Sequence, residues 1–162
     1  VLLGAWLALG VLRVHPHYLA YFNELAGGPE NGYRWLVDSN LDWGQGLKTL
    51  AVELRRRGSP RIYLSYFGVA DPSAYGIAYL PVGSVSNVDR RSGVAEPGPQ
   101  DPVFLAVSAT NLQGVYYSQK ESFSWLLSRR PIFSAGHSIF LYDLTHDGDA
   151  RRRLAGMVMA SP

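Results

Sequence analysis

The segment Asp42–Gly68, DWGQGLKTLAVELRRRGSPRIYLSYFG, contains the two patterns that decide the fold class. Its first half spaces apolar residues as an amphipathic α-helix does, at Leu47, Leu50, Ala51 and Leu54. Its second half, Ile62 to Phe67, is rich in β-branched and aromatic residues and is followed by Gly68, which predicts a buried strand. A helix followed directly by a buried strand indicates an α/β domain.

The same segment carries signals for both ends of its helix. Asp42 is a favourable N-cap residue, and Gln45, three positions later, completes a capping-box pattern. Three arginines suit the C-terminal end of the helix dipole, and Gly58 and Pro60 follow them. We therefore expect a helix that begins near Asp42 and ends before Gly58.

Three further strands and one further helix are predicted around this unit. Tyr33 to Val37, Val103 to Val107 and Ser138 to Leu144 have the composition of short strands, and Glu121 to Ser128 that of a short helix. Strands that alternate with helices are typical of a parallel sheet. The expected fold is therefore α/β, with a small, mostly parallel four-stranded sheet and helical crossovers; the last strand could run either way.

An apolar run without charge, Val1 to Leu12, begins the sequence. As a helix it would cover about 18 Å of the roughly 30 Å of hydrocarbon in a bilayer. We expect it to be the end of a transmembrane helix rather than a buried core helix, in a fragment of a longer protein. The expected organisation is a transmembrane end in 1–14, a juxtamembrane amphipathic helix and turn in 15–32, an extracytoplasmic α/β domain in 33–146 and a frayed tail in 147–162.

Composition excludes several classes of function. The net charge of +2 and the absence of a basic stretch interleaved with aromatics argue against nucleic acid. The chain has no cysteine, which excludes disulfides and thiolate metal sites. Leu80 to Pro102 is rich in proline and glycine and is expected to be a long irregular loop.

Polar residues follow three of the predicted strands. In an open parallel sheet the carboxyl ends of the strands share one edge, where ligands bind. Carboxylates, amides, hydroxyls and an indole together suit a sugar. The candidate substrate-binding residues are Asp38, Asn40, Asp42, Trp43, Gln45, Asp71, Thr110 and Asn111.

Structural roles compete with this interpretation for every residue, since Asp42 could be only a helix cap and Trp43 could simply pack. A divalent cation between Asp38 and Asp42 is conceivable but unsupported, so no metal and no cofactor is predicted. His15 and His17 have metal-like spacing, yet histidines that flank a proline beside a membrane are more often interfacial residues. No serine lies in a nucleophile-elbow motif, and no catalytic residue is assigned.

Several segments, taken together, resemble the C-terminal region of bacterial membrane glycosyltransferases of family 39, the dolichyl-phosphate-mannose mannosyltransferase-like type. The strongest are HPHYLAYFNEL at His15–Leu25, GGP at Gly27–Pro29, NGY at Asn31–Tyr33 and DSNLDWGQ at Asp38–Gln45. The likeness continues through Tyr66–Gly68, Asp71–Pro72, Ser108–Gly114 and Gly136–Phe140.

The resemblance implies a parent protein with a multi-helix membrane domain, which takes a sugar from a polyprenyl-phosphate carrier. It also implies that this domain lies at the cell membrane, on the extracytoplasmic side. In that family the catalytic carboxylate lies in the first extracytoplasmic loop, and nothing here corresponds to it. The expected function is therefore a non-catalytic accessory domain that binds acceptor or sugar. Its expected partners are the bilayer, the rest of the parent protein, and a polyprenyl-phosphate-linked sugar or acceptor.

Two other functions stay open from the sequence. One is a free-standing carbohydrate-active hydrolase that uses Asp38 and Asp42 as acid and base. A helix N-terminus lowers rather than raises the pKa of a carboxyl group, which disfavours this role. The other is a protein-interaction module of a membrane complex, with the loop from Leu80 to Pro102 as its surface.

Overall fold

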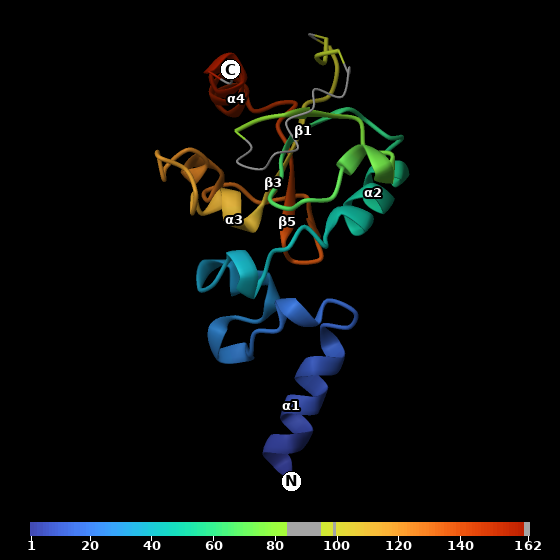
Figure 1. Ribbon diagram of the computed structural model, residues 1–162, viewed down its shortest axis with the longest axis vertical. Coiled ribbons are helices and arrows are strands. Elements are labelled where there is room, and N and C mark those ends of the chain that lie inside the picture. Colours follow the sequence, from blue (N-terminus) through green and yellow to red (C-terminus); the bar gives the residue numbers. More distant parts are fainter. Residues whose placement is uncertain (84–94, 99, 161–162) are drawn as a thin grey trace.

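The computed structural model describes residues 1–83, 95–98 and 100–160, and these contain a five-stranded mixed sheet (Figure 1). The strands are β1 (Ile62–Ser65), β2 (Tyr79–Pro81), β3 (Phe104–Ser108), β4 (Phe133–Ala135) and β5 (Ile139–Asp143), in the order β2-β1-β3-β5-β4. β2, β1 and β3 are parallel, whereas β5 is antiparallel to both β3 and β4. The α/β class is confirmed, but a four-stranded and mostly parallel sheet was the wrong expectation.

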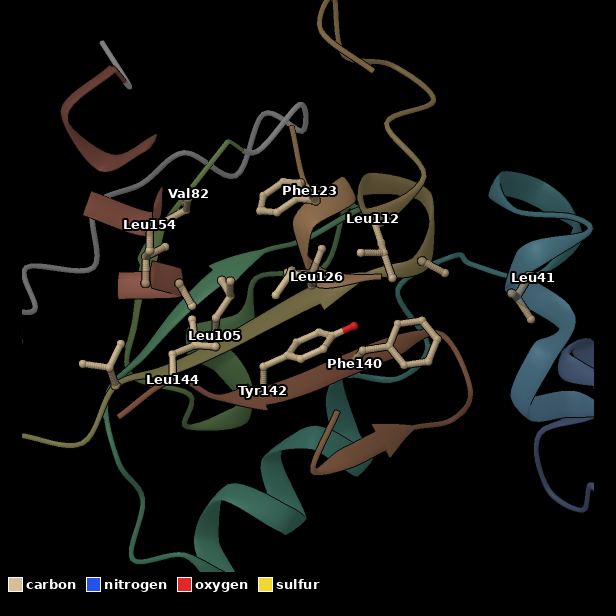
Figure 2. Close-up of a cluster of buried hydrophobic side chains, with 14 of the residues drawn as sticks. Leu41, Val82, Leu105, Leu112, Phe123, Leu126, Phe140, Tyr142, Leu144 and Leu154 are labelled. Carbon is tan, nitrogen blue, oxygen red and sulfur yellow. The ribbon is translucent and has the colours of Figure 1, made fainter. Parts of the chain in front are cut away.

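The central strand β3 separates two apolar clusters. Its five residues are all buried, because Leu105 and Val107 face one cluster while Phe104 and Ala106 face the other. Helix α2 (Leu47–Arg56) covers the second face with the four apolar residues that its spacing predicted, which confirms that helix. The first face is covered by α3 (Ala109–Leu112), the 3-10 helix η6 (Ser124–Leu126) and α4 (Gly148–Ala160) (Figure 2).

The predicted strand at 33–37 does not form. Its first residues belong to the 3-10 helix η3 (Pro29–Arg34), where Gly32 lies so close to the ring of Phe22 that a Cβ atom would come within 2.3 Å of it. Tyr33 packs against Phe140 of β5 with ring centroids 4.7 Å apart. Tertiary packing therefore determines the conformation of residues 33–37. Because no strand forms there, α2 precedes the first strand of the sheet instead of connecting two strands. The crossover from β1 to β2 contains the 3-10 helix η5 (Pro72–Tyr75).

The C-terminal part confirms one expectation and corrects another. The short helix expected in 121–128 forms as the 3-10 helix η6, over Ser124–Leu126. The expected frayed tail is helix α4, whose Ala150 and Leu154 are buried in the core. Arg129 attaches this helix to the domain by ion pairs with Asp147 at 2.7 Å and Asp149 at 3.1 Å.

The N-terminal part consists of α1 (Leu2–Arg13) and a chain of 3-10 helices. These are η1 (Tyr18–Ala20), η2 (Glu24–Ala26) and η3, and they replace the single amphipathic helix expected in 15–32. Among the described residues, no helix combines the length and the apolar character needed to cross a membrane. Most residues of α1 are nevertheless exposed and apolar.

The long loop predicted from Leu80 to Pro102 begins later than expected. Leu80 and Pro81 belong to the short edge strand β2, which pairs with β1. Residues 84–94 and 99 lie outside the described part of the chain. The expected interaction surface of this loop therefore stays a prediction.

Candidate functional site

The loop that connects the N-terminal part to α2 lies on the carboxyl end of β3. The Asp38 N–H donates to Oγ1 of Thr110 at 3.0 Å, and the Thr110 N–H donates to Oδ2 of Asp42 at 3.3 Å. Thr110 lies in α3, directly after β3. The structure thus brings Asp38, Asp42 and Thr110 together at one edge of the sheet, although the strand expected before Asp38 is absent.

Asp42 is fully buried and holds this loop together. Its Oδ1 accepts the Gly44 N–H at 3.2 Å, and its Oδ2 accepts the Thr110 N–H. Burial raises the pKa of Asp42 to about 6, and the hydrogen bonds from Thr110 and Gly44 oppose the rise. The predicted capping role is wrong, because α2 begins at Leu47 and Gly46 occupies its N-cap position. The expected lowering of the pKa is therefore also wrong.

Gly44 allows the loop to pass close to the sheet. The Tyr66 hydroxyl donates to the Gly44 carbonyl at 3.3 Å, and a Cβ atom on Gly44 would come within 1.9 Å of that hydroxyl oxygen. The φ angle of Gly44, +76°, also favours glycine. Burial, followed by the charge of Asp42, raises the pKa of Tyr66 to about 12. Tyr66 is thus a neutral hydrogen-bond donor to the loop.

The exposed side of the loop presents Trp43. Its indole is 62% exposed, and the indole N–H donates to the Ser39 carbonyl at 2.9 Å. Gln45, also exposed, stabilises the loop, because its side chain accepts the Trp43 backbone N–H at 2.8 Å and donates to the Leu41 carbonyl at 2.8 Å. The oxygen and the nitrogen of the Gln45 side-chain amide are therefore both bonded to backbone groups of its own loop rather than to a capping position.

Asp38 connects this loop to a pair of aromatic rings that the sequence reasoning missed. The Tyr116 hydroxyl donates to Oδ2 of Asp38. The Tyr116 ring stacks on Phe67 with an interplanar angle of 7° and centroids 5.6 Å apart. Tyr116 is 53% exposed. Nothing in the periodicity of the sequence marks Tyr116 or Phe67, and only the contact with Asp38 identifies them.

The remaining predicted residues have different surroundings. Asn40 is exposed beside Asp38 and donates to the Val37 carbonyl at 3.5 Å. Asn111 is buried and donates to Ser65 Oγ at 3.0 Å. Asp71 caps η5 by accepting the Ser73 N–H at 2.9 Å. We name the loop surface after five exposed or half-buried residues: Asp38, Asn40, Trp43, Phe67 and Tyr116.

The edge of the sheet that carries the loop surface packs on the N-terminal part (Figure 1). The Gln113 side chain, just after α3, donates to the Tyr33 carbonyl at 3.1 Å. On the turn between β4 and β5, His137 Nδ1 lies 2.9 Å from Glu30 Oε1, and its ring meets that of His17 edge-on at 5.9 Å. His137 therefore contacts two residues of the N-terminal part.

Neither acidic nor histidine groups form a metal centre in the part of the chain that the structure describes. Both carboxylate oxygens of Asp42 already accept backbone N–H groups, so Asp42 is poorly placed to share a cation with Asp38. The loop surface can instead offer ring faces, one carboxylate and one amide to a polar ligand. Comparisons with known protein families, with curated proteins and with solved structures found no match.

Proposed function

We propose that this chain is a non-catalytic accessory domain of a membrane glycosyltransferase that uses polyprenyl-phosphate-linked sugar. In this proposal the loop surface binds the saccharide of the acceptor or of the carrier. The observation that carries the proposal is the position of this surface, on the sheet edge that packs against the segment leading from α1. The resemblance to family 39 enzymes supplies the reaction class.

The chemistry of the loop surface supports a saccharide ligand. The exposed rings of Trp43 and Tyr116 can cover the apolar faces of sugar rings. Asp38 accepts the Tyr116 hydroxyl through one oxygen, and its other oxygen has no hydrogen-bond partner among the described residues. That oxygen can accept a sugar hydroxyl, and the amide of Asn40 can both donate and accept.

Burial of Asp42 favours a binding role over hydrolysis. Glycosidases need two carboxyl groups that both reach the scissile bond. The raised pKa of Asp42 would suit a general acid, but its side chain is fully buried and both of its oxygens accept backbone N–H groups. Asp38 is the only one of the two carboxylates that faces the loop surface, so the hydrolase alternative lacks its second group.

Two features support a membrane location: the exposed apolar surface of α1 and the resemblance to membrane enzymes. Leu3, Leu7 and Leu12 of α1 are exposed, which suits contact with lipid or with other membrane helices. We propose that α1 lies in the cell membrane and that the sheet domain lies on its extracytoplasmic side. The bilayer and the rest of the parent protein are then its permanent partners.

Turnover by the whole chain in lipid nanodiscs tests the non-catalytic part of this proposal. We expect neither sugar transfer from polyprenyl-phosphate sugars nor hydrolysis of them. Turnover that Asp38→Asn or Asp42→Asn abolishes, in a chain that stays folded, would contradict the proposal and restore the hydrolase alternative.

A further inference from the structure

An open groove lies on the N-terminal part, between η2 and η3. It has a volume of about 440 Å³ and is lined by Leu25, Ala26, Gly27, Asn31, Arg34 and Trp35. Two hydrogen bonds shape it: the Trp35 indole N–H donates to the Ala26 carbonyl at 2.8 Å, and the Asn31 amide donates to the Gly27 carbonyl at 2.9 Å. The groove is therefore built by the fold of this segment rather than by loose side chains.

The walls of the groove expose large apolar side chains to solvent. Leu25 is 88% exposed and Trp35 is 66% exposed. Leu36, beside the groove, is 49% exposed. An exposed tryptophan next to exposed leucines is typical of a surface at the boundary between lipid and water, where the indole ring is favoured.

One cation of the groove has no acidic partner among the described residues. Arg34 donates to the Tyr33 hydroxyl at 3.3 Å, and its guanidinium lies 5.7 Å from the centre of that ring. The neighbouring acidic groups are already engaged, since Glu24 pairs with Arg13 at 3.5 Å and Glu30 pairs with His137 at 2.9 Å. Arg34 is thus free to bind an anion, and guanidinium groups match phosphate well.

The groove and α1 belong to the same N-terminal part, in which exposed apolar side chains recur. Most of the exposed large apolar side chains that the structure describes lie in residues 1–36: Val1, Leu2, Leu3, Trp6, Leu7, Leu9, Leu12, Tyr18, Leu19, Leu25, Trp35 and Leu36. The Arg13–Glu24 ion pair joins the end of α1 to η2. Gly10 of α1 packs against the ring of Tyr21. The 3-10 segment therefore lies where α1 would leave a bilayer (Figure 1).

We propose that this groove binds the anionic headgroup of a membrane phospholipid, with Arg34 on the phosphate and Leu25 and Trp35 among the first acyl carbons. Such a contact fixes the height of the sheet domain above the bilayer. The inference rests on the membrane placement of α1 in the proposed function, and it does not depend on sugar binding at the loop surface.

The absence of cysteine from the chain permits a test with a single fluorescent label. The complete chain is reconstituted in nanodiscs with a bimane label at Leu36→Cys, beside the groove, or at Leu127→Cys, a control of similar exposure, 47%. Quenching is measured with equal amounts of acyl-chain nitroxide phosphatidylglycerol or phosphatidylcholine. The variants are Arg34→Gln and, as an exposed control, Arg130→Gln.

We expect quenching at position 36 and none at position 127. The apparent association should favour phosphatidylglycerol about fivefold, the effect of roughly one basic residue at an anionic surface. In Arg34→Gln the ratio of association with phosphatidylglycerol to that with phosphatidylcholine should fall close to one. In Arg130→Gln the ratio should stay about fivefold. Equal quenching by the two lipids, equal quenching at both positions, or a preference that survives Arg34→Gln would overturn the inference. If the chain shows the expected quenching and lipid preference but binds no sugar, only the proposed function is contradicted.

Discussion

The carboxylate of Asp42, fully buried, accepts the backbone N–H of Thr110 at 3.3 Å and so joins the loop before α2 to the end of β3. This contact spans 68 residues of sequence. The contact fixes the loop relative to β3, because the same carboxylate also accepts the N–H of Gly44 within the loop. The position of the loop surface therefore depends on a residue that does not itself face solvent.

Replacement of Asp42 should change how stability depends on pH. The pKa of Asp42 is raised from 3.8 to about 6 in the folded chain, so between these values the native state binds more protons than the unfolded state. The contribution of Asp42 to the free energy of unfolding should therefore grow as pH falls from about 6 to about 4, by an amount on the order of 3 kcal/mol.

Urea unfolding of the wild-type chain and of Asp42→Asn across pH 4 to 7 checks this expectation. Asparagine cannot titrate, so the difference in free energy between the two chains should become more favourable to the wild type as pH decreases. A difference that stays constant over this range would contradict a raised pKa for Asp42.

Gly44→Ala should destabilise the chain far more than Gly76→Ala, although the two glycines have nearly the same φ angle. Gly76 has φ +75° and open space around its Cβ position, whereas a Cβ atom on Gly44 would meet the Tyr66 hydroxyl. We expect a loss of about 1 kcal/mol for Gly76→Ala from the left-handed backbone alone. For Gly44→Ala we expect a further loss of about 1 to 3 kcal/mol from the steric conflict.

Denaturant unfolding of both variants measures this difference. Adding Tyr66→Phe should recover part of the loss in Gly44→Ala, since it removes the oxygen that a Cβ atom would approach most closely. Equal losses for the two alanine variants would show that Gly44 is not closely packed.

Arg129 should control the attachment of α4. Its side chain pairs with Asp147 and Asp149 and lies 5.2 Å from the centre of the Trp125 ring. Arg129→Gln should speed amide hydrogen exchange in the first turns of α4, whereas Arg130→Gln, an exposed neighbour, should not. Hydrogen–deuterium exchange of residues 148–158 distinguishes the two, and equal protection in both variants would contradict the role of Arg129.

The packing of the N-terminal part on the sheet should weaken at mildly acidic pH. Burial, followed by the charges of His137 and His15, lowers the pKa of His17 below 6.5, so His17 favours the folded state in its neutral form. This contribution is complete above pH 6.5 and is lost as pH falls below that value, through the lower folded-state pKa. The pKa of Glu30 is lowered below 4.5 by its hydrogen bond with His137, so its contribution is complete above pH 4.5 and is lost only as pH falls below that value, through the folded-state pKa.

Amide hydrogen exchange in residues 17–34, corrected for the intrinsic effect of pH, should therefore be faster at pH 5.5 than at pH 7.5. His17→Gln should reduce this dependence because glutamine cannot titrate. If the exchange rates of His17→Gln depend on pH as strongly as those of the wild type, a group other than His17 causes the dependence.

The sequence predicted the parts of the fold that depend on strong local patterns. Helix α2 and the buried strands β1, β3 and β5 follow from runs of apolar residues with a clear period. The edge strands β2 and β4 have three residues each and therefore too little pattern to recognise. Tyr33–Val37 has strand-like composition, yet its contacts with Phe140 and Gln113 favour a different conformation.

The candidate site was only partly predictable for a related reason. Thr110 lies at the carboxyl end of β3 as predicted, because it directly follows that strand. Asp38 and Asp42 follow no strand and reach the same edge through their hydrogen bonds with Thr110. The burial of Asp42 depends on three-dimensional contacts that no spacing reveals. The cap of η5 by Asp71 is a local contact, which a cap residue followed by Pro72 indicates from the sequence. The Phe67–Tyr116 stack joins residues far apart in sequence, so it could be found only from the fold.

Saccharide binding at the loop surface is tested most directly by NMR of the Trp43 indole N–H, assigned with Trp43→Phe, during titration with a panel of hexose disaccharides. We predict a saturable shift of the Trp43 and Tyr116 signals for at least one saccharide. Asp38→Asn should abolish the shift in a folded chain, and Asp71→Asn, a change at the cap of η5, should preserve it. No saturable shift with any saccharide, or a shift that persists in Asp38→Asn, would contradict a sugar-binding accessory domain.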